Sequence, residues 1–169
     1  RGRECSSNQM PFIKEKFPSY HDFGIADMSM VFGDSELGKA LHYKATTFAT
    51  SYMENLGDFK FKIRKIEGIA QFSSINSILI EDFNHDRNLD ALLSGNLYQS
   101  EVETPRNDSG YGVLLEGNGK GQFTSKLPYK SGLFVKGDVK NAVIINTPTN
   151  ANKRIIFGKN DDEVQVVEY

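Results

Sequence analysis

Hydrophobic and polar residues follow two different patterns along the chain, and the change falls near residue 43. Before it, three runs with helix-start signals begin near Ser7, Ser19 and Ser35, because a serine side chain can accept a hydrogen bond from the first backbone N–H groups of a helix. After it, short apolar or alternating runs are separated by Gly, Asn and Asp, which is typical of β-strands joined by turns. The pattern predicts a helical segment over 1–42 and a mainly β region over 43–169.

The β region contains an internal repeat. Sliding the chain along itself places Gly57 on Gly119, Phe61 on Phe123 and Gln71-Phe72 on Leu133-Phe134. The repeat unit has the pattern of four strands joined by loops and a glycine-rich hairpin, which is the pattern of one β-propeller blade.

One complete unit is expected over 75–126, half a unit over 43–65 and most of another over 138–168. The predicted fold is therefore mainly β, a partial β-propeller of antiparallel four-stranded blades, about two and a fraction in number, preceded by an α-helical segment. A propeller usually needs about four to eight blades to close, so either the parent chain is longer or copies associate through open sheet edges. A smaller twisted antiparallel sheet covered by the N-terminal helices is also compatible with the pattern.

The stretch between two apolar runs, 78–80 and 91–93, is rich in side-chain oxygens. Such side chains occupy positions 1, 3, 5, 7 and 9 of this loop, which are Asp82, Asn84, Asp86, Asn88 and Asp90. A tight loop with ligands on alternate residues suits Ca²⁺, which takes about six to eight oxygen ligands. The loop is not an EF-hand, because Leu93 stands where that motif needs a bidentate Glu. The alternative is a solvated turn without metal, since Asn and Asp favour turns for backbone reasons.

This strand–acidic loop–strand unit resembles the FG-GAP/VCBS repeat of β-propeller proteins, whose loop reads D-x-[DN]-x-D-G-x-x-D. The resemblance implies a Ca²⁺ ion held by the side chains of Asp82, Asn84, Asp86 and Asp90 and by the backbone carbonyl of Asn88. Arg87 departs from the family, which usually has Gly there, at a position that tends to need a positive φ. A residue other than Gly pays about 1 kcal/mol or more for that conformation, which would weaken the site.

The likeness extends over nearly the whole chain, through stretches at 1–7, 44–48, 82–90, 100–108 and 117–123. In this order they resemble the C-terminal end of Bacteroidetes FG-GAP/VCBS repeat proteins. The resemblance implies an exported bacterial protein, in the periplasm, on the outer membrane surface or outside the cell. The chain opens on Arg1 without methionine or a signal segment, so we expect it to be a piece of a longer protein.

The composition argues against nucleic-acid binding, an internal disulfide and a membrane-spanning segment. A net charge of −2 and the lack of a long Lys/Arg run give no reason to expect nucleic-acid binding. A single cysteine, Cys5, excludes an internal disulfide. No apolar run approaches the roughly 18 residues that would span a bilayer.

A second candidate site lies in the loop 100–110, which is longer than a hairpin needs and carries several charges. Long charged loops on a rigid sheet are common places for binding residues. The candidate contact residues are Glu101, Glu103, Arg106 and Asp108. Paired carboxylates can also act as acid and base in glycoside hydrolysis when held about 5–9 Å apart.

The expected function is therefore a non-enzymatic, calcium-stabilised scaffold or binding module that interacts with a protein or a carbohydrate. The alternative is a carbohydrate-active hydrolase that uses the carboxylates of loop 100–110. A deep pocket with a raised carboxylate pKa would favour the enzyme, whereas a flat and solvated loop would favour the binding module.

Overall fold

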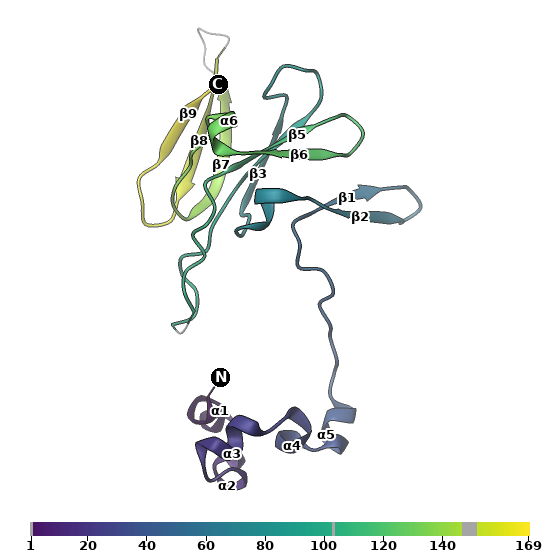
Figure 1. Cartoon of the computed structure of the whole chain (residues 1–169), viewed down its shortest axis with the longest axis vertical. Coiled ribbons are helices and arrows are strands. Elements are labelled where there is room, and N and C mark those ends of the chain that lie inside the picture. The colour runs from purple at the N-terminus through teal and green to yellow at the C-terminus, as the bar shows by residue number, and fades with distance from the viewer. Residues whose placement is uncertain (1, 103, 147–151) are drawn as a thin grey trace. The chain divides into compact units, whose positions relative to one another are not determined.

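A computed structural model describes residues 2–102, 104–146 and 152–169 (Figure 1). The chain divides into two compact units, Arg1–Thr46 and Thr47–Tyr169. The first unit contains short helices and the second contains the sheets. Each unit has a hydrophobic core of its own.

The first unit packs five short helices around a small apolar core. The helices are α1 (Arg3–Gln9), α2 (Phe12–Lys16), α3 (Tyr20–Ile25), α4 (Met28–Phe32) and α5 (Asp34–Lys39). Ile13, Phe17 and Val31 form the core, and the rings of Phe17 and Phe23 meet edge to face at 5.8 Å.

Only one of the three serine start signals marks a helix start. Ser19 caps α3, because its Oγ accepts a hydrogen bond from the backbone N–H of Asp22 at 3.0 Å. The signals at Ser7 and Ser35 were wrong in position: α1 already begins at Arg3, and α5 begins at Asp34. Ser7 is instead buried and donates its hydroxyl to the carbonyl of Glu4, which is the local bond a serine makes inside a helix.

Three antiparallel sheets of two, four and three strands make up the second unit, and none of the described sheets closes into a barrel. Within each sheet the strands follow one another in chain order (Figure 1). The two-stranded sheet is β1 (Ser51–Asn55) and β2 (Phe61–Lys65). The four-stranded sheet is β3 (Ser77–Glu81), β4 (Asp90–Ser94), β5 (Val113–Gly117) and β6 (Phe123–Lys126). The three-stranded sheet is β7 (Val139–Asn146), β8 (Lys153–Lys159) and β9 (Gln165–Glu168). A short 3-10 helix, η1 (Gly68–Gln71), and the helix α6 (Pro128–Ser131) lie in the connections.

Strand β4 lies at the centre of this unit and is buried along its whole length. Leu92 belongs to one core cluster, which includes Val139 and Phe157 of the three-stranded sheet. Ala91 and Leu93 face the opposite way and pack against Ala70 of η1. The apolar run Ala91-Leu92-Leu93 is therefore continuous because both faces of this strand are covered.

Polar side chains at the edge of the four-stranded sheet hydrogen-bond to backbone groups of other segments. Asn96 is 1% exposed, and its Nδ2 donates to the carbonyls of Gly110 at 2.9 Å and Gly137 at 2.8 Å. Asn76 donates to the carbonyl of Val139 at 2.7 Å, and the Oγ of Ser77 accepts a bond from Ala142 N–H at 2.9 Å. These bonds satisfy buried polar groups and fix the four-stranded sheet against β7.

The mainly β class predicted from the sequence agrees with these three sheets. None of the helices that the structure describes has the length and apolar character needed to cross a membrane.

We predict that Phe157→Ala lowers the free energy of unfolding of the β unit by about 3–5 kcal/mol, because Phe157 is fully buried and the change leaves a cavity. Urea unfolding followed by far-UV circular dichroism measures the loss. Phe59→Ala is the matched control: this ring is 99% exposed, and its removal should cost less than about 0.5 kcal/mol. Equal losses in the two variants would contradict the packing described for this core.

Candidate functional site

The acidic loop connects β3 to β4, and three of its polar side chains turn inward onto the loop's own backbone. Asp82 accepts hydrogen bonds from the backbone N–H groups of Asp86 at 3.0 Å and Arg87 at 2.9 Å. Asn84 Oδ1 accepts a second bond from Asp86 N–H at 2.9 Å, and Asp86 Oδ1 accepts one from Asn88 N–H at 2.7 Å. Side-chain oxygens of Asp82, Asn84 and Asp86 are thus gathered on one side of a tight turn.

Asp90 has a different role from the other four predicted ligands. Its side chain is completely buried, with one oxygen accepting from Phe83 N–H at 3.0 Å and the other from Gly117 N–H at 2.9 Å. The carboxylate therefore joins the acidic loop to the end of β5. A carboxylate oxygen has two lone pairs, so these bonds leave acceptor capacity on both oxygens.

The fit of this loop to a cation is partial. In the described chain, no three His, Cys, Asp or Glu side chains form a group with metal-holding geometry. The predicted ligand set relies on two asparagines as well as carboxylates, and Asp90 is occupied by structural hydrogen bonds. Calcium binding at Asp82, Asn84, Asp86, Asn88 and Asp90 stays a prediction.

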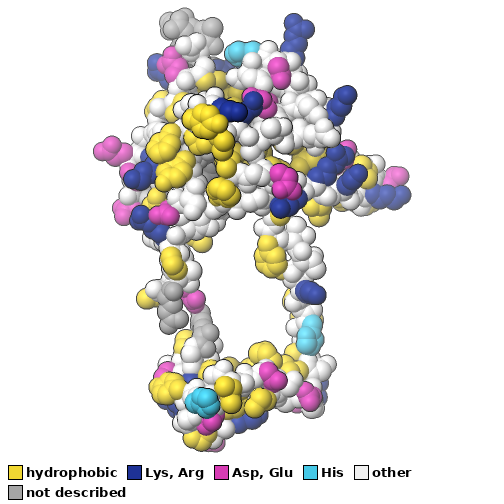
Figure 2. Space-filling view, viewed as in Figure 1, with side chains coloured by type: hydrophobic (Ala, Val, Ile, Leu, Met, Phe, Trp, Pro, Cys, Tyr) yellow, Lys and Arg dark blue, Asp and Glu magenta, His cyan; other side chains and the backbone are white. Residues whose placement is uncertain are grey.

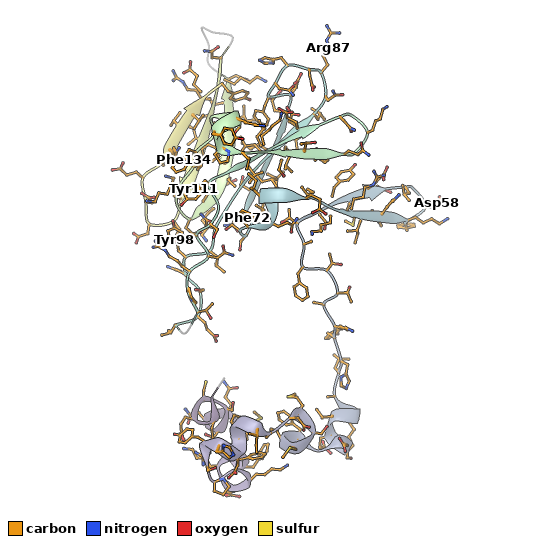
Figure 3. All side chains as sticks on the ribbon, viewed as in Figure 1. Asp58, Phe72, Arg87, Tyr98, Tyr111 and Phe134 are labelled. Atoms are coloured by element: carbon orange, nitrogen blue, oxygen red, sulfur yellow. The ribbon has the colours of Figure 1, made fainter. Side chains whose placement is uncertain are left out.

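The backbone at Arg87 has the conformation expected for the position where the resembling family has Gly. Its φ is 72°, and His85 two residues earlier has a φ of 60°. Both residues carry a Cβ in a region that costs about 1 kcal/mol or more. The side chain of Arg87 points away from the tip of the loop (Figure 3).

Hydrogen bonding lowers the pKa of Asp86 below its usual value. The largest cause is the bond from the backbone N–H of Asn88, and the side chains of Asn84 and Asn88 add to it. A depressed pKa keeps this exposed carboxylate ionised at neutral pH and at moderately acidic pH. The contribution to stability is present above the unfolded-state pKa and is lost as the pH falls through the folded-state value.

A cavity of about 590 Å³ adjoins the acidic loop, and no pattern in the sequence indicates it. Arg87, Asn88 and Leu89 of the loop form one wall, and Tyr52 of β1 and Phe123 of β6 form another. The two rings lie 5.4 Å apart with an interplanar angle of 59°. Apolar rings beside amide and guanidinium groups can bind a small polar molecule.

The loop 97–109 has a narrow base and an exposed tip. Leu97 and Asn107 exchange two backbone hydrogen bonds, of 2.9 and 2.8 Å, that close the base. Arg106 pairs with Asp108 at 2.9 Å, and its guanidinium lies 4.6 Å from the ring centre of Tyr98. The structure thus brings together two of the four predicted contact residues.

Of the other two predicted contacts, Glu101 is exposed and Glu103 lies outside the described residues. Residues 101, 102 and 104–109 are all exposed. The described part of this loop is therefore a solvated surface.

Exposed aromatic rings near this loop were also missed from the sequence. Tyr111 and Phe134 stack at 4.8 Å with an interplanar angle of 15°, although they are far apart in the chain. Phe134 is 58% exposed and Phe72 is 61% exposed. Figure 3 shows both rings with Tyr98 and Tyr111 at the end of the β unit that carries the loop. Exposed rings of this kind are common in surfaces that bind other molecules.

Comparisons with protein-family models, with curated proteins and with solved structures found no match for this chain. The resemblance to FG-GAP/VCBS repeats therefore depends on the residues of the chain itself.

We predict that Asp90→Ala lowers the free energy of unfolding by about 2–4 kcal/mol without calcium, because it leaves the buried N–H of Gly117 and that of Phe83 without an acceptor. Asp86→Ala in EGTA is the control and should cost clearly less than Asp90→Ala, since Asp86 is exposed. Urea unfolding compares the two variants. Similar losses of unfolding free energy in the two variants would show that the hydrogen bonds of Asp90 do not stabilise the fold more than those of Asp86.

A second prediction concerns the backbone of the loop. Arg87→Gly should raise the free energy of unfolding by about 0.5–1 kcal/mol, because Gly adopts a φ of 72° without the Cβ penalty. Asn88→Gly should lower it, because Asn88 does not have a positive φ and Gly only adds flexibility there. Thermal unfolding of both variants measures the difference, and destabilisation by Arg87→Gly would contradict the strain assigned to this position.

Proposed function

We propose that this chain is a non-enzymatic, calcium-stabilised scaffold or binding module of an exported bacterial repeat protein. The observation that carries the proposal is the loop between β3 and β4, in which Asp82, Asn84 and Asp86 turn their oxygens inward on alternate residues. Alternate oxygen ligands on a tight turn are the arrangement that suits Ca²⁺.

Calcium has a structural role in this proposal. Asp82, Asn84, Asp86 and Asp90 supply side-chain oxygens and Asn88 its carbonyl. The ion neutralises carboxylates that otherwise repel one another and fixes the loop before any ligand arrives, which reduces the ordering cost of binding. The same loop forms a wall of the cavity beside Tyr52 and Phe123, so fixing it also fixes that wall.

We further propose that the sheets are β-propeller blades of the FG-GAP/VCBS type. The four-stranded meander β3–β6 supports this, since it has the strand order of one blade and other parts of the β unit pack on both of its faces. The remaining two sheets correspond to an incomplete unit on each side of it.

The ligand of the module is a protein or a carbohydrate. Loop 97–109 and the exposed rings of Tyr111 and Phe134 support a contact surface at one end of the sheets. Aromatic rings bind apolar faces of either kind of partner, and the Arg106–Asp108 pair adds polar contacts.

The calcium proposal predicts that millimolar Ca²⁺ raises the melting temperature of EGTA-treated protein by several degrees. A ligand at a hundred times its dissociation constant adds about 2.7 kcal/mol, which corresponds to a shift of this size for a domain of this length. Asp86→Ala should abolish the shift. Asp58→Ala removes an exposed aspartate from the β1–β2 turn and should retain it, so it controls for loss of charge (Figure 3).

Two further measurements sharpen the result. Mg²⁺ at the same concentration should shift the melting temperature less, because it demands stricter octahedral geometry. Arg87→Gly should increase the response to Ca²⁺ if backbone strain weakens the site. An absent response in both the natural chain and Arg87→Gly would show that the loop is a metal-free turn.

A further inference from the structure

Three segments of the β unit line the cavity beside the acidic loop. They are the end of that loop with Asn88 and Leu89, strand β1 with Tyr52, and the start of β6 with Gln122 and Phe123. The acidic loop, the β5–β6 turn and the β1–β2 hairpin extend to the same side of the β unit (Figure 1). The volume of about 590 Å³ lies within the range of about 300–1,000 Å³ that is typical of small-molecule sites.

Close contacts between the three segments shape this cavity. Gly119 allows the approach of Asn88, because a Cβ at residue 119 would lie 2.5 Å from the Asn88 Oδ1. A Cβ on Gly121 would lie 3.0 Å from the ring of Tyr52, so the β5–β6 turn also approaches β1 closely. The ring of Tyr52 in turn meets that of Phe123 at 5.4 Å. The walls are therefore in place before a ligand arrives, which reduces the ordering cost of binding.

The lining combines aromatic rings with amide side chains. Tyr52 and Phe123 supply aromatic carbon, and the hydroxyl of Tyr52 has no hydrogen-bond partner among the residues that the structure describes. The Oε1 of Gln122 accepts a bond from Asn118 Nδ2 at 2.6 Å, which leaves the Nε2 of Gln122 as a donor. The amide of Asn88 lines the opposite wall. A sugar needs this combination, because its C–H groups pack on aromatic carbon and its hydroxyls both donate and accept hydrogen bonds.

The charges around the cavity favour a neutral ligand. Asp90 lines the cavity but gives both of its oxygens to backbone N–H groups, and the side chain of Arg87 points away from the tip of the loop (Figure 3). The carboxylates of Asp82 and Asp86 belong to the adjoining loop and would repel an anion. Figure 2 shows Lys and Arg side chains interspersed with Asp and Glu side chains on the visible face of the β unit, so a charged partner that approaches this face meets both signs.

We propose that the cavity binds a neutral sugar, with the rings of Tyr52 and Phe123 against its C–H groups and the amides of Asn88 and Gln122 bonded to its hydroxyls. This inference rests on the proposed role as a binding module, and it adds the ligand class and a site separate from loop 97–109. A concave site of this size encloses a sugar, whereas a standard protein–protein contact is a broader surface of about 800 Å² on each partner. Protein contacts alone hold the walls, so the sugar should bind in EGTA as well as in Ca²⁺.

The test screens the full chain against an array of neutral and acidic glycans, both in Ca²⁺ and in EGTA. Isothermal titration calorimetry then gives the dissociation constant for the neutral oligosaccharide that binds most tightly on the array. Tyr52→Ala should weaken this binding about tenfold or more, because the aromatic contact and the hydroxyl are both lost. Gln122→Ala should weaken it roughly three- to tenfold through the loss of one hydrogen bond.

Matched controls remove the same residue types elsewhere. Tyr129→Ala controls for Tyr52→Ala, because Tyr129 is 77% exposed on α6 and is not part of the cavity lining. Gln9→Ala, at an exposed residue of α1, controls for Gln122→Ala. Both controls should bind as the natural chain does. Circular dichroism establishes that each variant is folded, and if Tyr52→Ala is not, Gln122→Ala decides, since Gln122 is exposed.

The outcomes separate this inference from the calcium proposal. Binding of a neutral glycan in EGTA that both cavity variants weaken supports the inference, even if Ca²⁺ does not raise the melting temperature. A chain that binds no neutral glycan overturns it, and a Ca²⁺ response would then leave the calcium-stabilised scaffold standing. Binding that both cavity variants leave unchanged also overturns it, because the sugar would then lie elsewhere, for example at loop 97–109.

Discussion

Burial of β4 on both faces is the constraint on which the rest of the β unit depends. Leu92 on one side and Ala91 with Leu93 on the other require a covering layer in each direction. The three-stranded sheet supplies one layer, and η1 with the residues around it supplies the other.

The same burial determines where polar groups can lie. Strand β4 begins at Asp90 and is followed closely by Asn96, and both side chains are almost fully buried. Each is satisfied by backbone groups of other segments, Gly117 for Asp90 and Gly110 with Gly137 for Asn96. A buried polar group without partners would cost about 1–3 kcal/mol, so these bonds hold the connections in one arrangement. Asp90 also holds the acidic loop itself, because it accepts a hydrogen bond from the backbone N–H of Phe83.

Features encoded by local patterns were predictable from the sequence. The mainly β character followed from short apolar runs between Gly, Asn and Asp residues, because those residues favour turns through their own backbone preferences. The positive φ of Arg87 followed from its place in a nine-residue loop motif.

Features that depend on packing between distant segments were not predictable. Tyr52 meets Phe123, and Tyr111 meets Phe134, only because separate sheets pack together. No spacing rule places such pairs side by side. The serine start signals also show the limit of local patterns. Serine is a residue type that often caps helices, but Ser7 lies inside α1, where its hydroxyl donates to the carbonyl of Glu4. The proposed calcium ligand set is a local pattern too, and in it Asp86 already accepts a hydrogen bond from the backbone N–H of Asn88.

The narrow base of loop 97–109 has a consequence for how this surface can change. Leu97 and Asn107 close the base with paired backbone bonds, and residues 101, 102 and 104–106 beyond that base are exposed. Insertions or exchanges at the tip leave the sheet register untouched, so the loop can diversify while the scaffold stays constant. The same property makes it a natural place to graft a foreign peptide for display.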